Sequence, residues 1–348
     1  MCSSDLCGDG LMRIAAVLVA ALGLTACSAI GDFFTGTDEK PLPGQRVSVL
    51  TLEDSLKADP DMAGVEIRLP APYRNPDWSQ AGGHPSHAMH HLALADQVAV
   101  RWTADAGTGS SSQRRVTAAP ITGGGLVYTL DANSHLYAFR ADTGARAWNR
   151  DLVPKGEEGG AIGGGIALEA GVLYAGTAYG DMMAMRADNG EVLWSRRLGV
   201  PVRGAPTIAE GRAFVLTQNN QLHALSLDTG EQLWLHAGFS DAAGLLSGAS
   251  PAVANGVVLA PYTSGELFAL RADNGRVLWS DSLTRSGRLA VLSEVNDIAG
   301  LPVLDRGRVF AIGNAGRMVA IDLITGERLW EQDVAGVQSP DRKSTRLN

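Results

Sequence analysis

The segment GELFALRADNGRVLW, residues 265–279, contains the pattern that decides the fold, because the chain carries it five times. The other copies are HLYAFRADTGARAWN (135–149), DMMAMRADNGEVLWS (181–195), QLHALSLDTGEQLWL (221–235) and RMVAIDLITGERLWE (317–331). In every copy an alanine lies ten residues before a tryptophan and a glycine lies four residues before it. Two spacings kept through five copies indicate one structural unit that is repeated. The tryptophans are Trp148, Trp194, Trp234, Trp279 and Trp330.

Each copy has the pattern of a β-hairpin. Apolar and polar residues alternate on both sides of an Asp-Thr-Gly or Asp-Asn-Gly turn, which is typical of two half-buried strands joined by a tight turn. The last copy has Ile324 in place of the aspartate but keeps Gly326. A second pair of short apolar runs precedes each hairpin, as in GAPTIAEGRAFVL (204–216). The sequence therefore predicts four strands per copy.

The spacing of the copies indicates the architecture. They recur about every 45 residues, and a four-stranded repeat of that length is typical of a propeller blade. We therefore predict an all-β fold, a β-propeller of four-stranded blades, with about five complete blades in this chain. The five tryptophans are predicted to pack between neighbouring blades rather than to bind a ligand, because their large flat side chains suit that contact.

The composition argues against one class of partner and indicates the compartment. The 348 residues carry a net charge of −8 and contain no basic stripe interleaved with aromatic side chains, which argues against nucleic acid as a partner. The three cysteines, Cys2, Cys7 and Cys27, all precede the repeats. A repeat domain without cysteine suits an oxidising compartment and needs no disulfide.

The N-terminal region has the pattern of an exported protein. Residues 1–11 do not resemble the start of such a protein and are interpreted as extraneous. Met12 and Arg13, followed by the apolar run 14–22, predict a signal peptide over 12–26. It ends in Leu-Thr-Ala-Cys, which resembles a bacterial lipobox and predicts lipidation of Cys27; the alternative is an ordinary signal peptide with an incidental cysteine. A lipid on Cys27 would anchor the protein to a membrane, and Ser28 after it favours the outer membrane.

The remaining boundaries follow from composition. Residues 27–76 are polar and rich in proline, which predicts a flexible tether after the lipidated cysteine. The propeller is expected over 77–340. The tail DRKSTRLN, 341–348, suits no strand and is interpreted as extraneous, so the propeller is expected to be incomplete in this chain and to continue in the natural protein.

The segment before the first repeat contains four histidines, His84, His87, His90 and His91. Zinc binding is one hypothesis, but no second half of a zinc site is visible, and a loop that leads into a strand is favoured. Residues 98–102 are predicted to be that strand. Because Trp102 lies one repeat length before Trp148, we expect it to be the isolated outer strand of a blade that the other end of the protein completes.

Two insertions, 238–248 and 284–300, lengthen the region of the fourth repeat. Long loops on a repeat scaffold commonly lie on one rim and often bind partners. A partner contact is therefore predicted here, with an ordinary surface loop as the alternative.

The signal, the lipobox, the tether, the segment DWSQAGG (77–83) and the repeats together resemble the BamB family over residues 12–340. These are lipoprotein subunits of the outer-membrane barrel-assembly machinery with quinoprotein-type repeats. The resemblance implies an eight-bladed propeller on the periplasmic face of the outer membrane. It also implies binding to the central barrel-assembly subunit BamA and non-catalytic assistance to outer-membrane protein substrates.

The same resemblance implies where the partner binds. The matching residues in the two insertions are Leu245, Leu246, Leu292, Glu294 and Asp297. An arginine that the family has near the first insertion is absent, because Ser247 stands at that place.

The alternative function is a pyrroloquinoline-quinone-dependent dehydrogenase, since such enzymes share these repeats. They hold the quinone beside a disulfide of adjacent cysteines and a calcium bound by carboxylate and amide side chains. The repeats here contain no cysteine, and their aspartates lie mostly in turns, as Asp142 and Asp188 do. Because cofactor chemistry demands its own ligands, we expect no cofactor and no enzymatic activity.

Overall fold

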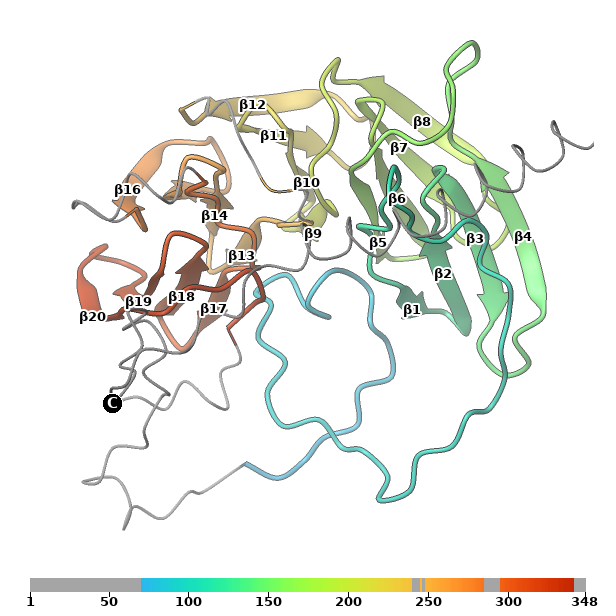
Figure 1. Ribbon diagram of the computed structural model, residues 1–348, viewed down its shortest axis with the longest axis horizontal. Coiled ribbons are helices and arrows are strands. Elements are labelled where there is room, and N and C mark those ends of the chain that lie inside the picture. The colour runs from blue at the N-terminus through green and yellow to red at the C-terminus, as the bar shows by residue number, and fades with distance from the viewer. Residues whose placement is uncertain (1–69, 240–244, 246–247, 285–294, 341–348) are drawn as a thin grey trace, which may run out of the picture. The chain divides into compact units, whose positions relative to one another are not determined.

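The computed structural model describes residues 70–239, 245, 248–284 and 295–340. All regular structure in these residues is β: twenty strands form five four-stranded antiparallel sheets, and no helix occurs among them. Figure 1 shows the sheets following one another along the chain, from β1 in teal to β20 in red. The predicted all-β fold with five complete four-stranded blades is confirmed.

Each sheet is formed by four strands that are consecutive in the chain, and we number the sheets as blades 1 to 5. Blade 1 contains β1 (Ile121–Gly123), β2 (Leu126–Leu130), β3 (His135–Arg140) and β4 (Arg146–Asp151). Blade 2 contains β5 (Gly164–Glu169), β6 (Val172–Thr177), β7 (Asp181–Arg186) and β8 (Val192–Arg197). Blade 3 contains β9 (Thr207–Ala209), β10 (Arg212–Leu216), β11 (Gln221–Ser226) and β12 (Gln232–Ala237).

Blade 4 contains β13 (Ala252–Ala254), β14 (Val257–Pro261), β15 (Glu266–Arg271) and β16 (Val277–Ser282). Blade 5 contains β17 (Val303–Asp305), β18 (Arg308–Gly313), β19 (Arg317–Asp322) and β20 (Arg328–Gln332). The first strand of each blade contacts the first strand of the next, in the order β1, β5, β9, β13 and β17. These first strands are therefore the inner strands of the blades.

The repeated alanine makes room for a contact between aromatic rings. In blade 1, Ala138 is fully buried and lies opposite Trp148 on one side and opposite Tyr128 on the other. The ring centroids of Tyr128 and Trp148 are 6.0 Å apart, so the two rings meet beside the small alanine. Blades 2, 3 and 5 have an equivalent aromatic pair. The register shifts directly after the alanine in every blade, as it does at a β-bulge.

The repeated glycine packs against the tryptophan side chain of the preceding blade. The indole Nε1 of Trp194 in blade 2 donates a hydrogen bond of 2.7 Å to the carbonyl of Leu227 in blade 3. Its ring lies against Gly230, where a Cβ atom would approach the ring to 2.6 Å. Gly230 also has a φ of 70°, a left-handed conformation that glycine adopts without strain. The turn therefore needs glycine for its own backbone and for the neighbouring ring.

The same junction occurs at each boundary between successive blades. The hydrogen bonds measure 2.7–3.1 Å, and the donor and acceptor pairs are Trp148 and Ala187, Trp194 and Leu227, Trp234 and Ala272, and Trp279 and Leu323. Trp330 ends this series in the described residues, where it contacts Phe310 of its own blade. Four of the five tryptophans thus lie between blades.

Trp102 makes the junction, but its segment is not a strand. Its Nε1 donates to the carbonyl of Ala141 at 2.9 Å, and its ring lies against Gly144 of blade 1. Residues 98–102, however, have no regular structure. The predicted isolated strand is therefore wrong, because a strand needs a neighbouring strand for its backbone hydrogen bonds and none is adjacent among the described residues.

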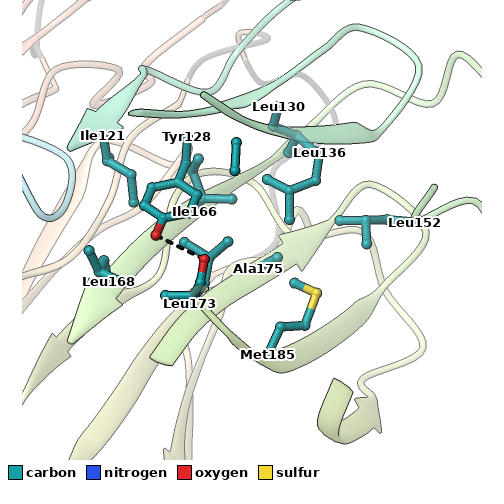
Figure 2. Packing of buried hydrophobic residues seen from close by; sticks show 12 residues of the cluster. Ile121, Tyr128, Leu130, Leu136, Leu152, Ile166, Leu168, Leu173, Ala175 and Met185 are labelled. Carbon is teal, nitrogen blue, oxygen red and sulfur yellow. Dashed lines mark hydrogen bonds between the residues drawn. The ribbon is translucent and has the colours of Figure 1, made fainter. Parts of the chain in front are cut away.

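The hydrophobic core lies between the blades. Figure 2 shows side chains of blade 1, among them Ile121 and Leu136, packed against Ile166, Leu173 and Met185 of blade 2. The hydroxyl of Tyr128 crosses this boundary to donate a hydrogen bond of 3.0 Å to the carbonyl of Ala187, shown as the dashed line. Each blade is therefore stabilised mainly by its neighbours, as expected for a repeat protein.

Candidate partner-docking site

The two insertions lie directly before inner strands. The first joins β12 to β13, and the second joins β16 to β17. Of the predicted partner-binding residues, the structure describes Leu245 and Asp297. Leu246, Leu292 and Glu294 lie outside the described residues, as does the predicted lipidation site Cys27, so those assignments stay predictions.

Asp297 is fully buried, and its carboxylate accepts a hydrogen bond from the guanidinium of Arg203, which is also buried. The same guanidinium donates to the carbonyl of Pro261 at 2.9 Å and to that of Ile298 at 3.1 Å. Arg203 precedes β9 of blade 3, Pro261 ends β14 of blade 4, and Asp297 precedes β17 of blade 5. One arginine therefore links three successive blades.

Both members of this ion pair are buried, so each charge depends on the other in place of water. Burial lowers the pKa of Arg203, and the adjacent carboxylate of Asp297 acts in the opposite direction. Removing one member of a buried pair leaves an uncompensated charge, which typically costs about 3–5 kcal/mol. The two side chains therefore act as one unit.

The carboxylate of Asp297 also holds the first insertion. The backbone N–H of Leu245 donates a hydrogen bond of 2.7 Å to Asp297 Oδ2, while the leucine itself is partly exposed. The two insertions therefore meet at a single buried carboxylate, although Leu245 and Asp297 are 52 residues apart in sequence.

The second insertion is fixed from other sides as well. The backbone N–H of Asn314 donates to the carbonyl of Asp297 at 2.9 Å, and its side-chain amide donates to the carbonyl of Val295 at 3.2 Å. The N–H of Ile298 donates to the carbonyl of Tyr262 at 3.3 Å. The end of this insertion is thus attached to blades 4 and 5 together.

These positions change the interpretation of Asp297. The family resemblance implied a residue that contacts the partner directly. A direct contact requires exposure, and Asp297 has an exposed fraction of 0%. Its carboxylate is used inside the protein, where it positions Leu245.

Sequence reasoning did not find Arg203. Its side chain reaches Asp297 across 94 residues of sequence, and no local spacing connects the two. Several other arginines lie between the repeats, so charge alone does not single out Arg203.

The histidine-rich segment does not form a metal site in the residues that the structure describes. No group of three or more His, Cys, Asp or Glu side chains is placed there to hold a metal ion. His87 is buried and bonded to a backbone carbonyl, and His91 Nδ1 lies 2.7 Å from the carbonyl of Pro70. Within the same residues, no helix is long and apolar enough to cross a membrane.

Comparison with solved structures supports the fold. The crystal structure of BamB from Moraxella catarrhalis superposes with a TM-score of 0.56 at 19% identity, covering 67% of this chain and 69% of that one. A quinohemoprotein alcohol dehydrogenase from Pseudomonas putida gives a TM-score of 0.59 at 17% identity, covering 75% of this chain and 48% of that one. At these identities both similarities concern the fold alone.

Comparison of sequences identifies the family. The chain is 25% identical over 223 residues to the outer membrane protein assembly factor BamB of Yersinia pestis, covering 63% of this chain and 57% of that protein. It is 27% identical over 344 residues to the BamB of Xanthomonas campestris, covering 97% of this chain and 74% of that protein. Several of the curated BamB relatives are aligned with this chain over only about half of their own length. The profile of the family described as outer membrane protein assembly factor BamB matches residues 132–345, and the chain therefore belongs to this family.

Proposed function

We propose that this chain is a non-catalytic scaffold of outer-membrane β-barrel assembly, held at the periplasmic face of the outer membrane by a lipid on Cys27. Membership of the BamB family and the names of its relatives support this role. In this proposal the scaffold binds the central barrel-assembly subunit BamA through the two insertions before β13 and β17. Assistance to outer-membrane protein substrates follows from that association.

The observation that carries the proposal is the hydrogen bond from Leu245 N to Asp297 Oδ2. Two insertions that merely decorated a repeat scaffold would have no reason to share a buried carboxylate. Here the carboxylate and its arginine fix the ends of both insertions to one place. Fixing a binding surface at these points pre-organises it, which lowers the entropy lost when a partner binds.

The position of Leu245 suits such a surface. Its backbone is held while its apolar side chain stays partly exposed. An apolar side chain held in place at the centre of a contact commonly contributes much of the binding energy, because burying it removes apolar surface from water. Leu245 is therefore the residue at which to test the proposal.

The test compares two leucine variants of the tagged full-length lipoprotein in detergent-solubilised envelopes. Leu245→Glu places a charge on the proposed surface, and Leu193→Glu places the same charge on β8 of blade 2, where the leucine is 46% exposed. We expect wild type and Leu193→Glu to co-purify with BamA, and Leu245→Glu to lose most of it. Circular dichroism checks that both variants are folded.

Two outcomes would contradict this proposal. If the folded wild-type protein recovers no BamA, the scaffold role fails. If Leu193→Glu loses BamA as completely as Leu245→Glu does, the contact does not lie at the insertions. The dehydrogenase alternative has no observation in its favour beyond the shared fold, and alcohol oxidation after addition of quinone and calcium would revive it.

A further inference from the structure

An irregular segment before the repeats touches every blade. Residues 78–87, which we call the strap, form backbone or side-chain hydrogen bonds with the inner strand of each sheet in chain order. The bonded pairs are Trp78 with Thr122 of β1, Ser79 with Leu168 of β5, Gln80 with Ile208 of β9, Pro85 with Val253 of β13, and Ser86 with Leu304 of β17. The strap therefore connects all five described blades, including blades that are not neighbours.

The middle of the strap binds blade 3 through a side chain. Gln80 is 5% exposed, and its side-chain amide pairs with the backbone of β9 as a neighbouring strand would. Oε1 accepts a hydrogen bond of 3.0 Å from Ile208 N, and Nε2 donates one of 3.4 Å to Ile208 O. This attachment lies on the strand that follows Arg203 and is separate from both insertions.

The end of the strap binds the two strands that follow the insertions. Val253 N donates to the carbonyl of Pro85 at 2.8 Å, and Leu304 N donates to that of Ser86 at 2.9 Å. Val253 lies in β13, which follows the first insertion, and Leu304 lies in β17, which follows the second. Two consecutive residues of the strap thus bridge the two strands.

His87 completes this bridge. Its Nδ1 lies 2.7 Å from the carbonyl of Pro302, directly before β17, and it must be the donor because a carbonyl oxygen only accepts. The ring is buried and packs on Gly82, where a Cβ atom would come within 2.8 Å of it. His87 has a φ of 57°, so its backbone is held in a left-handed conformation that few residues adopt. The surroundings evidently determine where this side chain lies.

We propose that residues 85–87 are a staple that fixes the distance between the two insertions, and that His87 is a positioning residue for the partner-docking surface. This inference rests on the proposed function, since it concerns the same surface. The Arg203–Asp297 pair holds the insertions from one side, and the staple holds the strands into which they run. Together the two attachments hold Leu245 and Asp297, one from each insertion, in one arrangement.

The test uses a loss variant, a rescue variant and a control, all in the full-length chain. His87→Leu replaces the imidazole by an apolar side chain of similar volume and so removes the donor to Pro302. His87→Asn places a δ-nitrogen donor where the imidazole has one and tolerates a positive φ. Gln80→Leu removes the attachment to blade 3, and the side chain of Gln80 is as buried as that of His87. If His87→Leu does not fold, His87→Gly replaces it, because glycine adopts this φ freely and also lacks the donor.

The first measurement is affinity for the purified periplasmic domains of BamA. We expect all folded variants to lose some stability, but only His87→Leu to weaken binding, by about tenfold, which corresponds to about 1.4 kcal/mol. His87→Asn is expected to restore most of the affinity. If His87→Leu and Gln80→Leu weaken binding equally, or if neither does, the staple has no specific role.

Hydrogen–deuterium exchange separates failure of the staple from failure of the proposed function. Peptides that cover 238–248 and 284–300 are expected to exchange faster in His87→Leu than in Gln80→Leu, whether or not BamA binds. Equal exchange in the two variants would overturn the staple. Absence of wild-type binding together with faster exchange in His87→Leu would overturn the proposed partner and retain the staple.

Discussion

The blades are held together in two different ways, at the tryptophan junctions and along the strap. Every tryptophan junction has the same parts: an indole ring, a glycine in a left-handed turn and a backbone carbonyl as acceptor. The contacts of the strap vary from blade to blade: it uses backbone groups at blades 1, 2 and 4, the side-chain amide of Gln80 at blade 3, and both the carbonyl of Ser86 and the ring of His87 at blade 5.

The difference shows what repetition can and cannot encode. A junction between identical neighbours can be copied with each new blade, so it leaves a periodic trace in the sequence. A segment that meets all blades once must meet each at a different residue. Its contacts are therefore aperiodic, and they can distinguish one pair of blades from the others, as residues 85–87 distinguish blades 4 and 5.

The largest expected effect is at a tryptophan junction. Trp194→Ala should lower the free energy of unfolding by about 3–5 kcal/mol, because it removes a large ring and its hydrogen bond between blades 2 and 3. Trp330→Ala should cost about 1–2 kcal/mol, since Trp330 lies at the end of the series in the described residues. Denaturant unfolding of both variants measures the difference. Equal losses would mean that the contact within a blade, and not the junction, provides the stability.

The junctions leave a pattern in the sequence, because each repeat has an alanine and a glycine at fixed distances from its tryptophan. The two spacings indicated a repeated unit, and the alternation of apolar residues, the turn sequence and the second pair of apolar runs then predicted its four strands. The strand expected at 98–102 failed for a local reason: Trp102 has the side chain needed for the junction, but its backbone has no strand beside it. A side-chain pattern can thus be right about a contact and wrong about the backbone that presents it.

The second expected effect belongs to the strap and depends on pH. Burial is the main reason that the pKa of His87 falls from 6.5 to about 4; the hydrogen bond to the Pro302 carbonyl opposes this shift, and nearby His84 adds to it. Between these values the unfolded chain binds more protons than the folded one, so stability falls as the pH is lowered from 6.5 to 4. The loss that His87 causes is about 3 kcal/mol.

Denaturant unfolding of the wild type and His87→Asn from pH 7 to pH 4 isolates this term, since asparagine does not titrate. His223 and His236, whose pKa values burial also lowers, contribute with the same sign in both proteins and cancel in the difference. An identical loss of stability in the two proteins would show that His87 is not kept neutral in the folded state.

The candidate site was less accessible from sequence than the fold. The insertions were visible as departures from the repeat, and a family resemblance indicated which of their residues to examine. The buried position of Asp297 and its pairing with Arg203 depend on how three blades meet, which no spacing in one segment records. The role of the four histidines was also hidden, because their order in sequence does not show that His87 alone is enclosed by blade 5.

The smallest expected effect tests whether the repeated glycine serves the junction or only its own turn. Gly230 and Gly211 both belong to blade 3, with φ values of 70° and 73°. A Cβ atom at Gly211 would meet nothing within 4 Å, whereas one at Gly230 would lie 2.6 Å from the ring of Trp194.

Both alanine variants suffer the backbone strain of a left-handed residue, about 1–2 kcal/mol, and only Gly230→Ala must also displace a packed ring. We therefore expect Gly230→Ala to lower the free energy of unfolding by about 1–3 kcal/mol more than Gly211→Ala. If the two variants are equally stable, the turn alone demands the glycine, and the blades adjust to one another more easily than their close packing indicates.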